Sequence, residues 1–341
     1  LTPSWVVLDS YKFDQRYHQA IVAGSAARVL VLDDQALLRH YASAAVLNQN
    51  LGATDSLYAG KLSAATTLLA GSSFAMLRRE FLETPRPVRS DLPPRRLLVT
   101  LGGSDPGNHS SSILRVLQSV LGSEHHVTLV VSSSHAHLSS LRSMLKQAPF
   151  QGTLACDVKD MASLMAESDL AISAAGSTCW ELACMQLPCL LLSVADNQIP
   201  LARAMADQGA AIDLGPADAL DESRLAATLR SLIHEGPRCL AMSQAAASVV
   251  DGKGVYRVLE AMAGPSLTLR PVTMNDARLL WDWRNEPATR AASFSSQIIP
   301  LESHIHWLQR RLDSASSQLY IACDLTDEPI GQIRFDLDQS E

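Results

Sequence analysis

The sequence lacks the paired cysteines of disulfide-rich and zinc-binding proteins. Its six cysteines form no Cys-x-x-Cys motif, and most of them lie in apolar runs. We interpret them as buried thiols in a reducing compartment, not as disulfides or metal ligands. A group of histidines also has no acid or cysteine at ligand spacing, so we predict no metal site at His125, His126, His135 and His137.

The sequence has no apolar run of the roughly 20 residues that a membrane-spanning helix needs. The longest candidate, residues 187–195, contains Pro188 and is followed by Asp196. We find no signal peptide and expect a cytoplasmic protein without a membrane partner. There is also no excess of basic residues. The sequence has 28 Lys and Arg and 35 Asp and Glu, which gives a net charge of −7. This balance argues against a nucleic-acid partner.

The 341 residues, 47% of them hydrophobic, suffice for two or more globular domains. Apolar runs predict strands at residues 5–9, 28–34, 45–48 and 66–70, and helical spacing predicts a helix at 13–23. Strands that alternate with helices indicate a parallel α/β sheet. Residues 84–94 contain four prolines and form the clearest linker, because proline cannot continue a helix or a central strand.

A second α/β unit follows the linker. We predict its strands at 96–101, 125–131, 170–173, 189–195 and 211–214, and its helices near 110, 160–165, 178, 198–208, 223–233 and 254–262. The glycine-rich loop after the first of these strands contains Gly103, Ser104 and Asp105. This loop follows neither the G-x-G-x-x-G dinucleotide fingerprint nor the P-loop pattern, so NAD and ATP lose support as ligands.

The composition changes again at residues 264–265. Beyond this point we predict a strand at 267–273, a helix capped by Asn275 and Asp276, a helix at 302–312 and strands at 319–323 and 330–336. The order β-α-α-β-β differs from the alternating pattern before it.

Residues 169–181 read as a buried strand, a turn of small residues and the start of a helix. A helix start presents unpaired N–H groups and partial positive charge, so Gly176, Ser177 and Thr178 could hold a phosphate, with Glu181 one turn further on. The alternative is a helix that caps itself, with Glu181 closing a capping box from Thr178.

Three polar or glycine-rich loops follow predicted strands of this one sheet: residues 102–105, 176–181 and 196–198. The carboxyl ends of parallel strands line the ligand crevice of an open α/β sheet. We therefore favour a ligand-binding role for Glu181. Tyr11 also follows a predicted strand, which suits a site residue, although a tyrosine there is more often packed with its hydroxyl satisfied locally.

These motifs resemble, in order and spacing, the nucleotide-sugar hydrolases of the pseudaminic acid pathway. The resemblance covers about residues 4–262 and rests on residues 7–11, 31–34, 69–81, 102–105, 175–181 and 195–198. It implies the GT-B fold: two Rossmann-like doubly wound α/β domains, here at 1–90, with its N-terminal part missing, and at 95–262. It also implies cleavage of UDP-2,4-diacetamido-2,4,6-trideoxy-β-L-altrose to free sugar and UDP, without a metal or other cofactor.

The resemblance assigns roles to single residues. Tyr11 and Asn197 would face the sugar as catalytic residues, and Glu181 would bind the uridine ribose. The remaining residues implied for the UDP-sugar are Gly103, Ser104, Asp105, Gly176, Ser177, Thr178, Asp196 and Gln198. The family's general-base histidine lies in a Gly-x-Gly-His-x-x-Arg loop that is absent between Leu1 and Glu341. We expect this sequence to be a piece of a longer protein, and we expect the piece itself to bind UDP but to hydrolyse the sugar poorly.

Residues 266–341 resemble the start of a GNAT acetyltransferase, of the type that acetylates the 4-amino sugar one step earlier. The family's acetyl-CoA loop does not occur in this segment. We therefore expect a partial α+β GNAT domain that binds no acetyl-CoA.

Three other functions stay open. The first is a GT-B glycosyltransferase that moves a sugar from UDP to a lipid or sugar acceptor. The second is a non-catalytic nucleotide-sugar binder that passes intermediates between units. The third is an α/β protein of unrelated function, because glycine and serine are common in turns.

Overall fold

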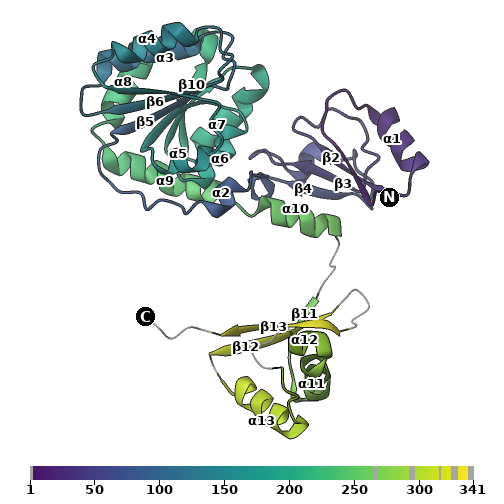
Figure 1. The fold of residues 1–341 in the computed structure, drawn as a ribbon. Coiled ribbons are helices and arrows are strands. Elements are labelled where there is room, and N and C mark those ends of the chain that lie inside the picture. The colour runs from purple at the N-terminus through teal and green to yellow at the C-terminus, as the bar shows by residue number, and fades with distance from the viewer. Residues whose placement is uncertain (1–2, 264–267, 292–295, 315, 324–328, 337–341) are drawn as a thin grey trace. The chain divides into compact units, whose positions relative to one another are not determined.

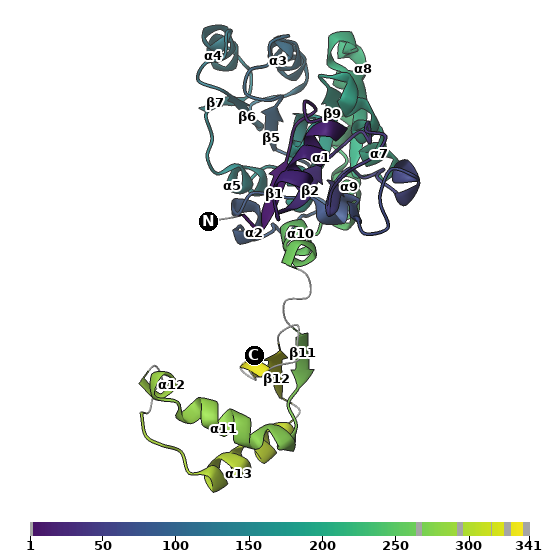
Figure 2. The same ribbon diagram turned by 90° about the vertical axis from the view of Figure 1, so that its right-hand side faces the viewer.

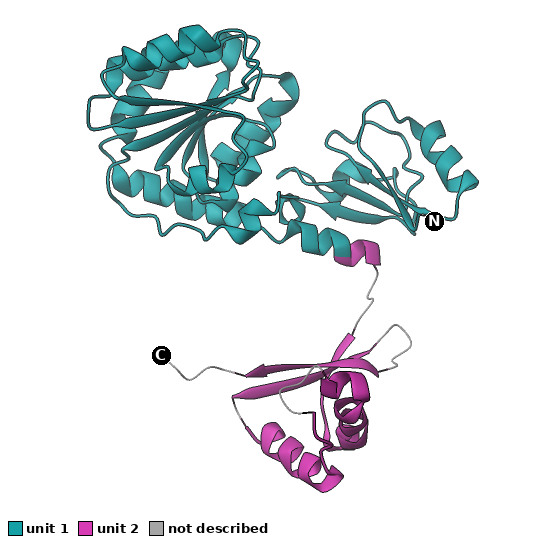
Figure 3. Ribbon diagram, in the orientation of Figure 1, with its two compact units in different colours: residues 1–259 teal, residues 260–341 magenta. Residues whose placement is uncertain are grey.

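The computed structural model describes residues 3–263, 268–291, 296–314, 316–323 and 329–336 (Figure 1). The chain divides into two compact units, residues 1–259 and 260–341 (Figure 3). Unit 1 contains two parallel sheets, and unit 2 contains one antiparallel sheet. Within these described ranges, no helix is both long and apolar enough to cross a bilayer.

The first sheet of unit 1 has four parallel strands in the order β1-β2-β3-β4. Their bounds are Trp5–Leu8, Arg28–Leu32, Ala45–Asn48 and Thr67–Ala70, and helix α1 spans Gln15–Gly24. The predicted strands are confirmed to within about two residues. Apolar side chains of β1 to β3 pack with Tyr41 and Tyr58 in the core of this part. The 3-10 helices η1 (Asp55–Tyr58) and η2 (Ser72–Phe74) flank β4.

The second sheet has six parallel strands in the order β10-β9-β8-β5-β6-β7. From β5 to β10, the strands span Arg96–Thr100, His126–Val131, Gln151–Cys156, Leu170–Ala174, Cys189–Ser193 and Ala211–Pro216. Read from β7, this is the doubly wound order 3-2-1-4-5-6, in which the strand order reverses between β5 and β8. The loops after these two strands are 102–105 and 175–177, two of the predicted ligand loops.

Helices cover both faces of this sheet (Figures 1 and 2). Helices α3 (His109–Val120), α4 (Leu138–Lys146) and α8 (Glu222–Leu232) pack on one face. The other face carries α5 (Met161–Ala166), α6 (Thr178–Cys184), α7 (Ile199–Asp207) and α9 (Gly236–Val249). Two further helices, α2 (Glu80–Glu83) and α10 (Gly254–Ala263), precede β5 and follow α9 along the chain.

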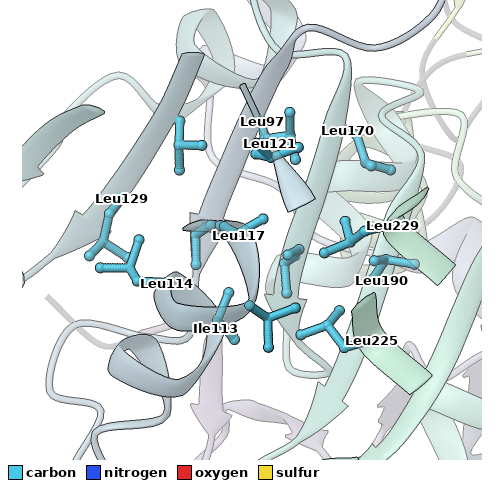
Figure 4. Packing of buried hydrophobic residues seen from close by; sticks show 14 of the residues in the cluster. Leu97, Ile113, Leu114, Leu117, Leu121, Leu129, Leu170, Leu190, Leu225 and Leu229 are labelled. Atoms are coloured by element: carbon cyan, nitrogen blue, oxygen red, sulfur yellow. The ribbon is translucent and has the colours of Figure 1, made fainter. Parts of the chain in front are cut away.

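The strands of this sheet are buried on both faces, which explains their continuous apolar runs. Leu97 and Val99 pack against α3 and α8, while Leu98 between them packs on the opposite face. Leu170 and Leu190 belong to the same buried cluster as Leu97, and Figure 4 shows these side chains together with Ile113 of α3. Each such leucine contributes about 1.5–3 kcal/mol when fully buried.

The sequence analysis missed β7, α4 and α9. Strand β7 is mostly polar or small and lies at the sheet edge, where its residues are half-buried or exposed. Cys156 ends this strand and is exposed, so our prediction of a buried thiol is wrong there. The other cysteines are buried.

The linker at 84–94 joins the two sheets but is not a free spacer. The guanidinium of Arg89 donates to the backbone carbonyl oxygens of Met165 (3.1 Å), Met185 (2.9 Å) and Ser168. Arg86 donates to the backbone carbonyl oxygen of Asp251. The prolines prevent regular structure, and the arginines fasten the segment to the second sheet and its helices.

Unit 2 follows the predicted order except for one short additional helix, at residues 287–291, that we did not predict. Strand β11 (Thr268–Pro271) precedes helices α11 (Ala277–Asn285), α12 (Pro287–Ala291) and α13 (Leu301–Leu312), and β12 (Ser317–Cys323) and β13 (Pro329–Asp336) complete an antiparallel sheet in the order β11-β12-β13. The carboxylate of Asp276 does not cap α11. It accepts from Arg270 and from the backbone N–H of Thr273 within η5 (Met274–Asp276). The predicted boundary at 264–265 lies outside the described residues.

Candidate functional site

A cavity of about 520 Å³ lies within unit 1, between residues of its two sheets. One wall comes from the loops after β1 and β2, including Tyr11 and Asp34. The other wall comes from the start of α6 and from η3 (Asp196–Gln198). The predicted site residues that line this cavity are Tyr11, Gly176, Ser177, Asn197 and Gln198.

Tyr11 lies on the rim of the cavity with 69% of its surface exposed. Its hydroxyl donates to Oδ2 of Asp34 at 2.5 Å. This hydrogen bond is the main reason that the pKa of Tyr11 is raised, while hydrogen bonding with Asn197 opposes the shift. Tyr11 therefore stays protonated at neutral pH, and because its single proton is donated to Asp34, its hydroxyl oxygen can accept a hydrogen bond from a ligand. Of the alternative interpretation, the packed ring is wrong, but the locally satisfied hydroxyl is confirmed by the bond to Asp34.

Asp33 and Asp34 are adjacent but have different surroundings. Asp33 accepts hydrogen bonds from the hydroxyls of Tyr41 and Tyr58, each at 2.7 Å. Burial raises the pKa of both tyrosines, so they remain donors and fix this wall. Asp34 instead accepts the hydrogen bond from Tyr11 at its Oδ2. Its Oδ1 is buried and has no hydrogen-bond partner among the described residues. The sequence analysis had Asp34 only as part of a motif.

His18 of α1 also lines the cavity and was not predicted. Its side chain is buried, and its Nδ1 has no partner in the described part of the chain. Burial lowers the pKa of His18, which keeps the imidazole neutral near pH 7. The residue lies inside a helix, without the glycines of the motif that we searched for. Only the folded chain brings it to the site.

The loops after β8 and β9 meet at the cavity, as predicted. A Cβ atom placed on Gly176 would lie 3.5 Å from Nε2 of Gln198. Oε1 of Gln198 accepts from the backbone N–H of Val194 at 3.0 Å, which fixes the amide over Gly176. Ser177 precedes α6 without a side-chain capping bond, so the structure does not contain the capping arrangement of the alternative interpretation.

Glu181 lies beside the cavity without lining it. Its Oε1 accepts from Nε and Nη2 of Arg78 at 3.3 and 3.2 Å. Burial raises the pKa of Glu181, and the charge of Arg78 opposes this shift. Thr178 and Asp196 also lie outside the cavity lining. Their predicted contacts with UDP stay predictions.

The loop 102–105 does not reach this cavity. Asp105 is buried, and its carboxylate accepts from the backbone N–H groups of His109 (3.0 Å) and Ser110 (2.8 Å) at the start of α3. Both oxygens of Asp105 thus hold a helix end, which leaves Gly102, Gly103 and Ser104 as the exposed members of the loop. A polar residue that follows a strand can therefore stabilise the fold and need not bind a ligand.

The segment that contains most of the second sheet is similar to a known protein family. Residues 99–257 match the family model described as the glycosyltransferase family 28 C-terminal domain. Over 165 residues the chain is 33% identical to the spore coat polysaccharide biosynthesis protein SpsG of Bacillus subtilis (strain 168), covering 48% of each protein.

A second relative is the UDP-N-acetylglucosamine–N-acetylmuramyl-(pentapeptide) pyrophosphoryl-undecaprenol N-acetylglucosamine transferase of Stutzerimonas stutzeri (strain A1501). It is 30% identical over 171 residues, which cover 49% of this chain and 47% of the relative. The chain thus spans about half the length of the curated relatives it matches.

Among solved structures, Acinetobacter baumannii MurG is similar with a TM-score of 0.56 and 16% identity, over 76% of this chain and 74% of that chain. At this identity the likeness concerns the fold. The comparisons support a glycosyltransferase-type enzyme better than the hydrolase that we expected. The chain has the predicted α/β, GT-B-like fold, and its second sheet lies in the segment that matches the glycosyltransferase family 28 C-terminal domain.

Proposed function

We propose that this protein is a UDP-sugar-dependent enzyme of the glycosyltransferase type, with UDP held by residues 99–257 and the sugar in the cavity. The observation that carries the proposal is the cavity itself. It joins the start of α6, within the matched segment, to Tyr11 and Asp34 of the first sheet. The named UDP-N-acetylglucosamine transferase among the relatives supports UDP as the nucleotide.

The chemistry follows from this arrangement. An acceptor hydroxyl attacks the anomeric carbon, and the bond to the diphosphate breaks, so that negative charge develops on the leaving UDP. N–H groups near the start of α6, at Ser177 and Thr178, stabilise that charge without reorganising. Tyr11 and Asn197 orient the sugar from opposite walls, and Glu181 accepts hydrogen bonds from the ribose.

A second candidate is hydrolysis, in which water is the acceptor. It is supported by one specific observation: Tyr11 and Asn197, the two sugar-facing residues implied by the hydrolase resemblance, line the same cavity. The sugar would then be a diacetamido-trideoxy hexose, as in pseudaminic acid synthesis.

One experiment separates these functions. The chain is incubated with UDP-N-acetylglucosamine or with UDP-2,4-diacetamido-2,4,6-trideoxy-β-L-altrose, with and without lipid or sugar acceptors, and followed by NMR. UDP and free sugar without an acceptor identify a hydrolase, whereas turnover only with an acceptor identifies a transferase. Binding of UDP without turnover supports UDP as the ligand and contradicts catalysis by this chain alone. Absence of UDP binding contradicts the proposal.

We further propose that residues 266–341 form a GNAT-like unit, separate from the Rossmann-like parts at 1–90 and 95–262. The support is the antiparallel order β11-β12-β13 with helices α11 to α13 between the first two strands. Because the acetyl-CoA loop does not occur in this segment, titration with acetyl-CoA should give no saturable binding. Saturable binding would contradict the predicted lack of acetyl-CoA binding.

A further inference from the structure

Arg78 connects two acidic residues near the start of α6. Its guanidinium contacts Oε1 of Glu181 through Nε and Nη2, and Oε1 of Glu80 through Nη1 at 3.1 Å. Glu80 is itself fixed, because its Oε1 accepts from the backbone N–H of Met161 at 3.2 Å. The guanidinium also lies 5.3 Å from the centre of the Phe81 ring. Arg78 therefore contacts three neighbours with a side chain that is 49% exposed.

The carboxylate of Glu181 is held on one side only. Both of its described hydrogen bonds use Oε1, and Oε2 has no hydrogen-bond partner among the residues that the structure describes. The side chain of Glu181 is 18% exposed, so the carboxylate is largely desolvated but not sealed. A carboxylate with one fixed and one available oxygen suits a ligand that offers hydroxyl donors.

We propose that Arg78 is a positioning residue, which orients Glu181 so that its Oε2 accepts hydrogen bonds from the ribose hydroxyls of UDP. This inference rests on the proposed function, in which Glu181 meets the ribose. Arg78 and Glu181 are 103 residues apart in the sequence. Arg78 lies outside the matched segment 99–257, so that segment alone lacks the partner of its own carboxylate.

The charge of Arg78 has a second effect on Glu181. Burial raises the pKa of Glu181, and Arg78 lowers it by charge and by hydrogen bonding. Removing Arg78 would therefore raise the pKa of Glu181 further and favour its protonated form. A protonated carboxyl group is a weaker acceptor for two hydroxyl groups.

The adjacent residue provides a matched control. Arg79 forms an ion pair with Glu83 at 2.6 Å, but both side chains are exposed, at 87% and 59%. Exposed pairs of this kind contribute little to stability. Arg78→Met and Arg79→Met therefore remove the same group one residue apart, and only the first substitution touches Glu181.

The experiment measures the Kd of UDP and of 2′,3′-dideoxyuridine diphosphate by calorimetry for the wild type, both arginine variants and Glu181→Gln. In the wild type, loss of the hydroxyls should weaken binding about tenfold or more. Arg78→Met should weaken UDP about tenfold and leave the dideoxy analogue almost unchanged. The ratio of the two Kd values then approaches one. Arg79→Met should keep the wild-type ratio.

Each outcome decides between the inferences. Suppose that the ratio of the two Kd values stays at the wild-type value in Arg78→Met but falls to about one in Glu181→Gln. This result overturns the role of Arg78 and leaves the proposed function intact. A wild-type ratio in Glu181→Gln shows that the ribose lies elsewhere, which overturns both roles. If Arg78→Met does not fold, Arg78→Gln keeps the apolar stem without the charge, and its ratio decides in the same way.

Discussion

The hydroxyl of Tyr11 donates to Asp34 across 2.5 Å and links the loops that follow β1 and β2. Asp34 raises the pKa of Tyr11, so the phenol keeps its proton at neutral pH. The ring itself is exposed and contributes little to the core. A side chain that is held by its polar end but not packed is suited to a ligand more than to stability.

Tyr11→Phe should therefore lower turnover of the UDP-sugar by about 10- to 100-fold, because the hydroxyl that Asp34 orients as a hydrogen-bond acceptor for the sugar is lost. The free energy of unfolding should change by only about 0.5 kcal/mol, as for other exposed positions. Steady-state kinetics and urea unfolding measure the two effects.

Tyr17→Phe is the matched control. Tyr17 stacks on Phe13 at 4.5 Å between ring centres, is also exposed and does not line the cavity. Loss of its hydroxyl should leave turnover at the wild-type rate. Equal losses in both variants would show that the effect of Tyr11 is not specific to the site.

Two glycine-to-alanine substitutions should affect different properties, UDP-sugar binding in one case and stability in the other. A Cβ atom on Gly176 meets only Nε2 of Gln198 at 3.5 Å, an ordinary contact, so Gly176→Ala should unfold like the wild type. The methyl group would narrow the cavity beside Ser177 and weaken UDP-sugar binding about tenfold. Calorimetry and thermal unfolding test both statements, and a large loss of stability would contradict them.

Gly236→Ala should destabilise the fold. Alanine normally gains about 0.5–1 kcal/mol over glycine within a helix. Here its Cβ atom would lie 1.8 Å from the carbonyl oxygen of Asp91, and backbone must move. Overpacking of this kind costs about 1–3 kcal/mol and outweighs the helical gain. A variant more stable than the wild type in urea would show that the backbone at Asp91 can move away from residue 236 at little cost.

Arg89→Ala should cost about 2–4 kcal/mol of unfolding free energy, because three carbonyl oxygens lose a charged donor. Burial lowers the pKa of Arg89 to about 10, so the guanidinium is still charged at neutral pH. Arg89→Lys should recover only part of the loss, since an ammonium group cannot reproduce the planar fork. Full recovery by lysine would show that charge alone is needed.

The stability of unit 2 should depend on pH through Asp276. The hydrogen bond from Arg270 lowers the pKa of Asp276 to about 2. A lowered carboxyl pKa stabilises the fold above its unfolded value near 4, and this contribution disappears as the pH falls towards 2. Arg270 is 42% exposed, so solvent limits the contribution to about 1–2 kcal/mol.

Asp276→Asn should remove this dependence. At pH 7 it should destabilise unit 2 by that same amount, and the slope of stability between about pH 4 and 2 should flatten. Urea unfolding followed by tryptophan fluorescence is suitable, because Trp281, Trp283 and Trp307 all belong to unit 2. An unchanged slope in the variant would assign the pH dependence to other acids.

The sequence predicted the parallel strands closely because β5, β8 and β9 are buried on both faces and consist almost entirely of apolar residues. Helix α9 escaped prediction because its small alanine and serine side chains blur the helical period. Strand β7 escaped because an edge strand can be polar. Local pattern therefore identifies elements with a strong apolar signal and misses those without one.

The site was predictable where it follows from strand ends. Tyr11, Ser177 and Asn197 each come after a predicted strand, and all three line the cavity. Arg78 belongs to the motif at 69–81, but its contact with Glu181 was not predictable, because no local spacing connects residues that are 103 positions apart. His18 was missed for the same reason, since only packing brings α1 to the cavity. Residues chosen by tertiary contact have no signal in one sequence.

The anchoring of residues 84–94 decides where this protein can be divided. The prolines suggest a cut just before β5, but a fragment that starts at residue 95 would leave the carbonyl oxygens of Met165, Ser168 and Met185 without Arg89. It would also release Glu181 from Arg78. A fragment that starts near residue 71 keeps these partners. A fragment meant to keep these contacts of the second sheet therefore has to begin before the proline-rich segment.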